Sequence, residues 1–248
     1  MGLWRRLGAH RLPAMFLTQR RTPPEYFDAL DRPLNELQAA YRQLGRVNRC
    51  FKFSHPFVWV LPRWLGRERC RRLEFLDLGA GDGLLGRILG RWAHQRGWDW
   101  QFTNLDINPR ALALNPNGRN VVGSVLALPF EEGCFDVVIA SQMTHHLNTE
   151  VEVVQHFREA WRVTREAVLL SDVHRNAGLM GLVWLGTLLL GCSRPLRADA
   201  LVSVQRAFRV AEWKSLAHQA GLADARVWLY AGTRLMLQAR KPAPTLSR

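Results

Sequence analysis

The chain has 248 residues, of which 48% are apolar, so it can form one large α/β domain or one domain with an extension. Its net charge is +13, but 15 Lys and Arg against five Asp and Glu fall in residues 1–72, and the remainder is nearly balanced. The longest apolar run, residues 177–192, is shorter than the roughly 18 residues that argue for a membrane span, and no secretory signal is evident. We therefore expect a soluble, cytoplasmic protein without a transmembrane segment.

The first 70 residues form an extension to the main pattern. Residues 1–24 mix Arg, apolar residues and a Pro pair without a period, which predicts a basic, loosely ordered arm. Residues 25–70 are expected to form a helical cap. One helix should start at Asp31-Arg32-Pro33, because Pro suits a first helical turn and an apolar stripe follows at helical spacing. We expect residues 51–65, rich in Phe, Trp and Pro, to pack over the mouth of the next domain.

Residues 71–242 alternate between strand and helix patterns, which predicts an α/β fold with a doubly wound, mostly parallel sheet. The expected strands are 73–78, 100–106, 120–123, 135–141 and 167–172, with helices at 84–95, 109–114 and 151–164. A further helix at 210–220 and an antiparallel hairpin of 225–230 with 235–240 complete this domain. Residues 243–248 are a tail.

The most informative segment is Glu74-Phe-Leu-Asp-Leu-Gly79-Ala-Gly81-Asp-Gly83, a buried strand that leads into alternating glycines and an apolar helix. Glycines at the carboxyl end of a strand allow positive φ and close approach of a ligand. The segment therefore predicts a loop that binds a nucleoside cofactor.

The identity of the nucleoside is a separate question, because Gly81, Gly83 and Gly86 also satisfy the dinucleotide pattern G-x-G-x-x-G. Two features favour a methyl donor. Asp77 precedes the first glycine, where a carboxylate suits a cationic ligand better than a pyrophosphate. The chain also has no Tyr-x-x-x-Lys pair for dehydrogenase chemistry.

Asp106 ends the second predicted strand and is followed by Asn108 and Pro109, a helix cap and a first-turn proline. An acid 23 residues beyond Gly83 is placed to accept both ribose hydroxyls of either cofactor. A helix-capping or surface role for Asp106 is the alternative.

These motifs together resemble the ubiquinone/menaquinone-type, or type 11, family of class I S-adenosylmethionine-dependent methyltransferases. The glycine loop, Asp106, Gly123–Phe130, Phe135-Asp136-Val-Val and His145-His146-Leu147 carry the resemblance, which covers roughly residues 73–172. It implies a Rossmann-like fold with an antiparallel last strand, and S-adenosyl-L-methionine across the carboxyl ends of the first strands. We assign to cofactor binding Asp77, Gly79, Ala80, Gly81, Asp82, Gly83, Asp106, Ile107, Ser124, Val125 and Gln142.

Ser124 departs from the family pattern, which usually has an Asp there that meets the adenine amino group. A serine hydroxyl still accepts a hydrogen bond, and Val125 and Leu126 can contact the ring. A degenerate cofactor site in a non-enzymatic protein is the alternative reading.

Catalysis and substrate binding are expected after the fourth and fifth strands. His145 and His146 are candidate bases, because imidazole titrates near neutrality, although a structural role is the alternative. Met143 and Asp172 are expected to border the substrate pocket. The apolar run 177–192, within an insertion at 177–209, predicts a helix or helical hairpin whose Met180 and Trp184 line an apolar pocket, with core packing or membrane-surface contact as alternatives.

The function predicted is methyl transfer to oxygen, or to an activated carbon, of an apolar acceptor such as a phenolic polyketide or quinone-like metabolite. The second hypothesis is an RNA- or membrane-associated binding protein that uses the Arg-rich N-terminal region on a methyltransferase-like scaffold. Nucleic acid is the less expected partner. The scattered cysteines predict free thiols and no metal site. The acceptor and the oligomeric state are left open.

Overall fold

The computed structural model describes residues 17–242 and centres on one seven-stranded sheet. The strand order is β3-β2-β1-β4-β5-β7-β6. The first five strands pair in parallel, and β7 is antiparallel to both of its neighbours, as predicted. The strands are β1 (Leu73–Leu78), β2 (Trp100–Asp106), β3 (Arg119–Val122), β4 (Phe135–Ser141), β5 (Thr164–Val173), β6 (Arg226–Tyr230) and β7 (Arg234–Arg240).

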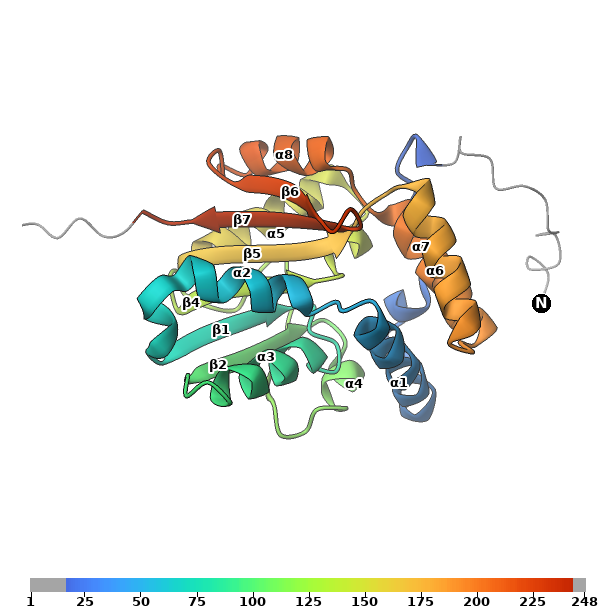
Figure 1. The fold of residues 1–248 in the computed structure, drawn as a ribbon, viewed down its shortest axis with the longest axis horizontal. Helices are drawn as coiled ribbons and strands as arrows, with labels where there is room; N and C mark the ends of the chain where they lie inside the picture. Colours follow the sequence, from blue (N-terminus) through green and yellow to red (C-terminus); the bar gives the residue numbers. More distant parts are fainter. Residues whose placement is uncertain (1–16, 243–248) are drawn as a thin grey trace, which may run out of the picture.

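Helices cover both faces of the sheet and the edge where its parallel strands end (Figure 1). One face packs against α2 and α3, and the other against α5 and α8. Three helices, α1, α6 and α7, gather beyond the carboxyl ends of the strands. The helices are α1 (Leu34–Cys50), α2 (His55–Leu65), α3 (Leu84–His94), α4 (Pro109–Leu112), α5 (Glu150–Val163), α6 (Ala177–Leu189), α7 (Arg194–Arg206) and α8 (Val210–Gln219).

The central strands are apolar on both faces, which explains the near-continuous hydrophobic runs in the sequence. In β1, Phe75 packs in the cluster beneath α2 and α3, whereas Leu76 packs with Phe157 of α5 on the opposite face. All three side chains are fully buried. The two clusters fix β1 at the middle of the sheet, so its carboxyl end opens at the centre of the helical layer.

The expectation that residues 51–65 cover the mouth of the domain is wrong for α2. Phe57 and Leu61 are fully buried and pack against the sheet in the same cluster as Val137 of β4. The apolar face of α2 is thus part of the main core rather than of a separate cap. The helix that does lie over the carboxyl ends of the strands is α1.

The predicted basic arm, residues 1–24, falls mostly on residues outside the described range. Its described part, residues 17–24, is packed against the domain. Leu17 is buried, and the Arg20 guanidinium donates hydrogen bonds to the carbonyl oxygens of Arg206 (2.6 Å) and His145 (3.0 Å). This segment leads into a short 3₁₀ helix, Tyr26–Asp28, beside α7.

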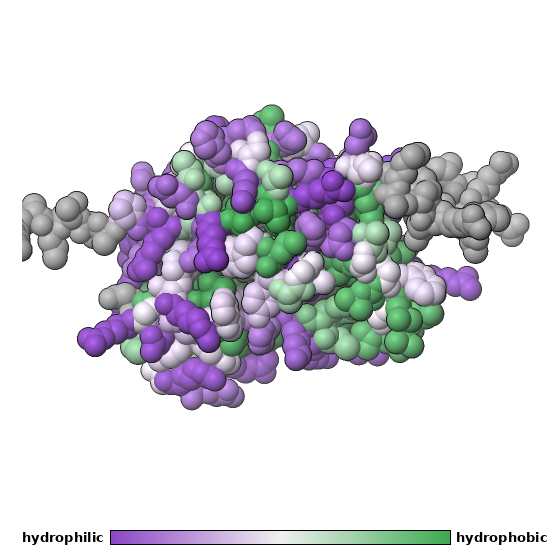
Figure 2. Space-filling model, turned by 45° about the horizontal axis from the view of Figure 1, so that its top comes forward, coloured by the Kyte–Doolittle hydropathy of each residue, from purple (hydrophilic) through white to green (hydrophobic). Residues whose placement is uncertain are grey.

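Residues 177–206 form the predicted helical hairpin, α6 and α7, joined by a turn at Gly191. The outer side of α6 is apolar and exposed, and Leu189 is 77% accessible. Figure 2 shows apolar residues gathered at this end of the molecule. None of the described helices has both the length and the apolar character that crossing a membrane requires.

Candidate functional site

A cavity of about 510 Å³ lies at the carboxyl ends of β1, β2 and β4, between these strands and the helices α1 and α7. Open α/β sheets bind ligands at this edge. The cavity brings together most of the residues that the sequence singled out for cofactor and substrate binding: Asp77, Gly79, Ala80, Gly81, Asp82, Asp106, Ile107, Ser124, Val125, Gln142, Met143, His145 and His146. Segments up to 69 residues apart therefore meet at one site.

The glycines of the loop after β1 meet two requirements: a positive φ, and close packing against neighbouring segments. Gly79 and Gly81 have φ of +63° and +56°, and a Cβ on Gly81 would lie 2.7 Å from the Tyr41 hydroxyl of α1. The loop is thus pressed against α1 with no room for a side chain. Gly83 does not line the cavity, and its part in cofactor binding stays a prediction. It precedes α3 with φ of +68°, and a Cβ there would lie 2.5 Å from Asn115 Nδ2.

Asp77 is a buried acid of the site with one oxygen that lacks a partner in the described part of the chain. Its side chain is buried, and Oδ2 has no hydrogen-bond partner among the described residues. Burial raises the pKa of Asp77 to about 8, and the nearby charges of Asp106 and Asp82 act in the same direction. An unpaired buried carboxyl group is costly unless a ligand compensates it. The site is therefore suited to a ligand that carries positive charge, as the sequence predicted.

Asp106 is held by two backbone amides, one on each oxygen. The amide of Gly81 donates to Oδ2 and that of Asn108 to Oδ1, both at 2.8 Å. Burial raises the pKa of Asp106, although these hydrogen bonds oppose the shift. Each carboxylate oxygen retains a lone pair that can accept a hydroxyl. The pair of oxygens can therefore accept a ribose diol, and the cap itself is made by Asn108.

The wall beyond β3 is suited to a flat apolar ring. Ile107 is 56% exposed at the rim, and Val125 and Leu126 lie nearby in the same wall. The Ser124 hydroxyl accepts a hydrogen bond from the amide of Leu126 at 3.2 Å. Its O–H remains a donor, whereas the carboxylate usual in the family would only accept. Ser124 can therefore both accept and donate a hydrogen bond at this end of the cavity.

The end of β4 is fixed to α1 and to the glycine loop. Gln142 adopts φ of +56°, and its Nε2 donates to Asn48 Oδ1 of α1 at 2.9 Å. Met143 packs on Gly79, where a Cβ would lie 2.1 Å from its Cγ. This packing explains why the first glycine tolerates no side chain.

His145 is buried between two carboxylates. Its Nδ1 lies 2.6 Å from Asp172 Oδ1, and its Nε2 lies 3.5 Å from Glu25 Oε1. Burial alone lowers the pKa of His145, but Asp172 and Glu25 outweigh burial and raise it to about 10. The ring is therefore protonated at neutral pH in the unliganded protein and cannot accept a proton from an acceptor. Asp172 does not line the cavity as predicted, because it is fully buried behind His145.

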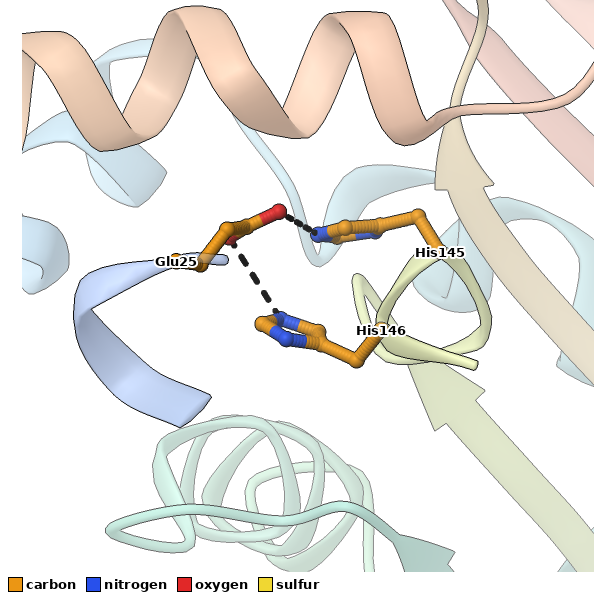
Figure 3. A group of neighbouring side chains, drawn as sticks. All are labelled: Glu25, His145 and His146. Atoms are coloured by element: carbon orange, nitrogen blue, oxygen red, sulfur yellow. Dashed lines mark ion pairs between the residues drawn. The ribbon is translucent and has the colours of Figure 1, made fainter. Parts of the chain in front are cut away.

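His146 is partly exposed and lies beside His145, with ring centroids 4.4 Å apart. Its Nδ1 lies 2.7 Å from Asp28 Oδ1 in the short N-terminal helix. Glu25, from the same N-terminal segment, faces both imidazole rings (Figure 3). The loop after β4 and the N-terminal segment thus form one polar cluster in the cavity wall.

The expected place of Met180 and Trp184 in the pocket is wrong. Met180 is buried in a small cluster with Leu17 and Val204, and Trp184 is 52% exposed on the outer side of α6. Of the two helices of the hairpin, it is α7 that lines the cavity, because it lies between α6 and the strands. Its contribution consists of Leu196, Asp199, Ala200 and Ser203.

Sequence reasoning missed the polar residues that join distant segments. Arg206 is buried, and its guanidinium donates to the carbonyl of His145 (3.0 Å) and to Asp28 Oδ2 (2.7 Å). Glu25 and Asp28 are 118 or more residues away from the histidines that they face. A single sequence contains no local signal for such contacts.

Comparison with known proteins places residues 76–170 in the family described as "Methyltransferase domain". An uncharacterized methyltransferase of Mycobacterium sp. (strain JLS) is 30% identical over 115 residues, which are 45% of this chain and 39% of that protein. Residues 76–170 are thus similar to a methyltransferase domain, and they lie in the parallel part of the sheet. This domain includes the glycine loop, Asp106 and both histidines, whereas Glu25, Asp28 and α7 lie outside the matched segment. The chain spans about two fifths of the length of the curated relative.

Solved structures share the fold of the methyltransferase domain and its flanking helices. Magnesium protoporphyrin IX methyltransferase of Synechocystis PCC 6803 with bound SAH is 16% identical, with a TM-score of 0.54, over 82% of this chain and 95% of that one. The plantazolicin methyltransferase BamL, in complex with a triazolic desmethylPZN analog and SAH, is 11% identical with a TM-score of 0.60, over 86% of this chain and 99% of that one. At these identities the likeness concerns the fold.

Proposed function

We propose that the protein binds S-adenosyl-L-methionine and transfers its methyl group to oxygen, or to an activated carbon, of an apolar small molecule. The buried Asp77 carboxyl group, whose Oδ2 has no hydrogen-bond partner among the described residues, is the observation that carries the cofactor assignment. It lies beside the glycine loop, and a sulfonium or ammonium group supplies the positive charge that this buried acid lacks. The two oxygens of Asp106 are available for the ribose diol, and the wall at Val125 for the adenine ring.

The bound cofactor supplies an electrophilic methyl group on a cationic sulfur. The protein's own contribution is to hold the acceptor in line with that group and to exclude water. Gln142 and Met143, at the end of β4, fix the floor of the cavity by their contacts with α1 and the glycine loop. A rigid floor favours a constant distance between the acceptor and the methyl group.

The rest of the cavity supports an apolar acceptor. Its lining includes the apolar residues Phe27, Leu30, Leu44, Phe53, Leu147 and Leu196, together with the histidine cluster. An aromatic ring can bury its faces on these side chains while one hydroxyl reaches the polar cluster. This pattern fits a phenol or a quinol better than a charged substrate.

A transfer assay tests this proposal. The protein is incubated with methyl-labelled S-adenosyl-L-methionine and a panel of apolar phenols and quinols, with a protein substrate and RNA as comparison acceptors. We expect label in at least one small aromatic acceptor and its loss in Asp106→Ala. Transfer only to protein or RNA would contradict the assignment of the acceptor class.

We also propose that α6 contacts an anionic membrane surface. Its exposed side chains, among them Trp184 and Leu189, form an apolar face larger than scattered surface leucines would give. The turn after α6 is hydrogen-bonded to α1, because the amide of Ser193 donates to Gln43 Oε1 at 2.8 Å. This contact places exposed arginines of α1 next to the apolar face. Arg46 and Arg49 line the same groove as Ser193. Apolar side chains with adjacent arginines are typical of helices that lie on anionic lipid.

A further inference from the structure

We propose that Glu25, His145 and His146 form a binding site for one divalent transition-metal ion, of the zinc class, in the wall of the cavity. One oxygen or ring nitrogen from each of the three side chains lies within 4.8 Å of the others. Glu25 comes from the N-terminal segment and the histidines from the loop after β4, and the three groups converge (Figure 3). Two imidazoles and one carboxylate are a ligand set that occurs in catalytic zinc sites.

The tautomers of both histidines favour this role. Nδ1 of His145 is bonded to Asp172 at 2.6 Å, and Nδ1 of His146 is bonded to Asp28 at 2.7 Å. Metal-binding histidines usually donate their second ring N–H to a carboxylate in this manner, which fixes the ring and leaves the other nitrogen for the metal. Both remaining Nε2 atoms face the Glu25 carboxylate.

The two distances between the imidazoles and the Glu25 carboxylate are closer to those between ligands of one ion than to those of direct hydrogen bonds. Nε2 of His145 lies 3.5 Å from Glu25 Oε1, and Nε2 of His146 lies 3.7 Å from Glu25 Oε2. A charge-assisted hydrogen bond would be near 2.7–2.9 Å. Two ligands at about 2.0–2.1 Å from one tetrahedral ion are separated by roughly 3.3–3.4 Å. In addition, Glu25 Oε1 is buried without a hydrogen-bond partner in the described part of the chain.

The surroundings hold the carboxylate in place and leave the ion accessible from one side. The Ser203 hydroxyl donates to Glu25 Oε2 at 3.0 Å. The Arg206 guanidinium also lies near this carboxylate, with Nε 3.5 Å from Glu25 Oε1, and its charge is offset by Asp28, which accepts a hydrogen bond from Nη1 at 2.7 Å. Since all three ligands line the cavity, an ion bound here has open coordination positions toward it.

The metal site also has a consequence for the proposed methyl transfer, and this step rests on that function. An acceptor hydroxyl bound to the ion loses its proton to water more readily, because the metal stabilises the oxyanion. The oxygen–methyl bond then forms as the sulfur–methyl bond breaks, which leaves a neutral thioether. The ion would thus do the work of a general base, while His145 and His146 hold the ion.

Cobalt titration tests the site without any cofactor or acceptor. Protein that has been dialysed against chelator is titrated with Co²⁺, whose visible absorption reports nitrogen and oxygen ligation, and then with Zn²⁺ as competitor. We expect one equivalent to bind, and at least a tenfold loss of affinity in both Glu25→Gln and His146→Gln. His55→Gln is the matched control, because His55 is exposed and bonded to Tyr230 outside the cavity.

Two further measurements keep the test independent of folding defects. Asp28→Asn retains all three ligands but weakens the carboxylate contacts to His146 and to Arg206, so we expect weaker metal binding with unchanged binding of S-adenosylhomocysteine. The X-ray absorption spectrum of the zinc-loaded wild-type protein should show two imidazole ligands. Absence of stoichiometric binding, equal binding in Glu25→Gln and His146→Gln, or sulfur ligation would overturn the proposal. None of these results depends on methyl transfer.

Discussion

Asp172 at the end of β5 accepts two hydrogen bonds from His145, one from the backbone amide at 2.8 Å and one from Nδ1 at 2.6 Å. The pair is buried, so it fixes both the position of the loop after β4 and the direction of the ring. Met143, in the same loop, packs on Gly79 of the glycine loop. The contact between β4 and β5 thus determines the geometry of the cofactor side and of the acceptor side together.

Replacement of Asp172 by Asn should destabilise the protein and change how its stability depends on pH. Truncating one member of a buried charged pair costs about 3–5 kcal/mol. The pKa of His145 is raised to about 10 in the folded state, so the stabilising effect of its charge is present below about pH 6.5 and is lost as the pH rises toward 10. Thermal unfolding between pH 6 and pH 10 should show a shallower decline in Asp172→Asn. Equal slopes in the two proteins would contradict this account.

Asp77 should couple proton release to binding of the methyl donor. Burial raises its pKa to about 8, so the group is mostly protonated at pH 7, and a cationic ligand favours the ionised form. Titration calorimetry in buffers of different ionisation enthalpy should detect proton release with S-adenosyl-L-methionine and less with S-adenosylhomocysteine, which lacks the sulfonium charge.

Asp77→Asn should abolish that difference between the two ligands. Because the raised pKa of Asp77 makes the stability of the unliganded protein fall from about pH 4 toward pH 8, the variant should also be more stable at pH 8. Asp82→Asn is the comparison, since Asp82 is already paired with Arg87 at 3.0 Å. If Asp77→Asn still released a proton on binding, a group other than Asp77 would be the one that titrates, and this account would be contradicted.

Gly81→Ala should weaken cofactor binding at least tenfold while the fold is retained. The added Cβ would lie 2.7 Å from the Tyr41 hydroxyl, and the residue needs φ of +56°. Gly97→Ala is the matched control, because Gly97 has φ of +73° but no atom within 4 Å of the added Cβ. The control should lose about 1 kcal/mol of stability and no affinity. Equal affinity losses in both variants would mean that backbone strain, not the closeness of α1, limits this loop.

Membrane contact by α6 is tested with vesicles. Wild-type protein should sediment with anionic phosphatidylglycerol vesicles more than with neutral phosphatidylcholine vesicles, and Leu185→Ser/Leu189→Ser should reduce this several-fold. Val151→Ser is the control, because Val151 is 78% exposed on α5, away from the patch. Vesicle binding that survives the double substitution, or salt-sensitive binding to RNA alone, would contradict the proposal.

The sheet was predictable from the sequence because its strands are buried on both faces and therefore stand out as apolar runs. The bounds of β1, β2 and β4 match the prediction, and Thr164–Val173 extends the predicted fifth strand by three residues at its start. Thr164 belongs to the strand because it pairs with Phe135 of β4 before a register shift, whereas pairing with β7 begins only at Ala167. Pairing partners of this kind are not encoded in a local pattern.

Only those parts of the candidate site that lie within one short segment of the sequence were predictable. The glycine loop and Asp106 follow their strands directly, so a pattern locates them. The helices around the cavity were harder to place. The apolar pattern of residues 51–65 fits packing on the sheet as well as packing over the cavity mouth. The apolar pattern of α6 likewise does not reveal that α7 lies between α6 and the cavity. Glu25 reaches the histidines only through tertiary packing. The prediction of no metal site was based on the spacing of the cysteines, and it could not include the contact between Glu25 and the histidines.

The most direct test of the central assignment is calorimetric titration of the protein with S-adenosylhomocysteine, with NAD and NADP as controls. We expect binding of S-adenosylhomocysteine alone, weakened about tenfold to a hundredfold in Asp106→Ala, as the loss of charge-assisted hydrogen bonds worth about 1.5–3 kcal/mol requires. Asp106→Asn should lie between the two proteins, because an amide keeps one acceptor oxygen. Binding of NAD or NADP in its place, or unchanged affinity in Asp106→Ala, would contradict the assignment of this cavity to S-adenosyl-L-methionine.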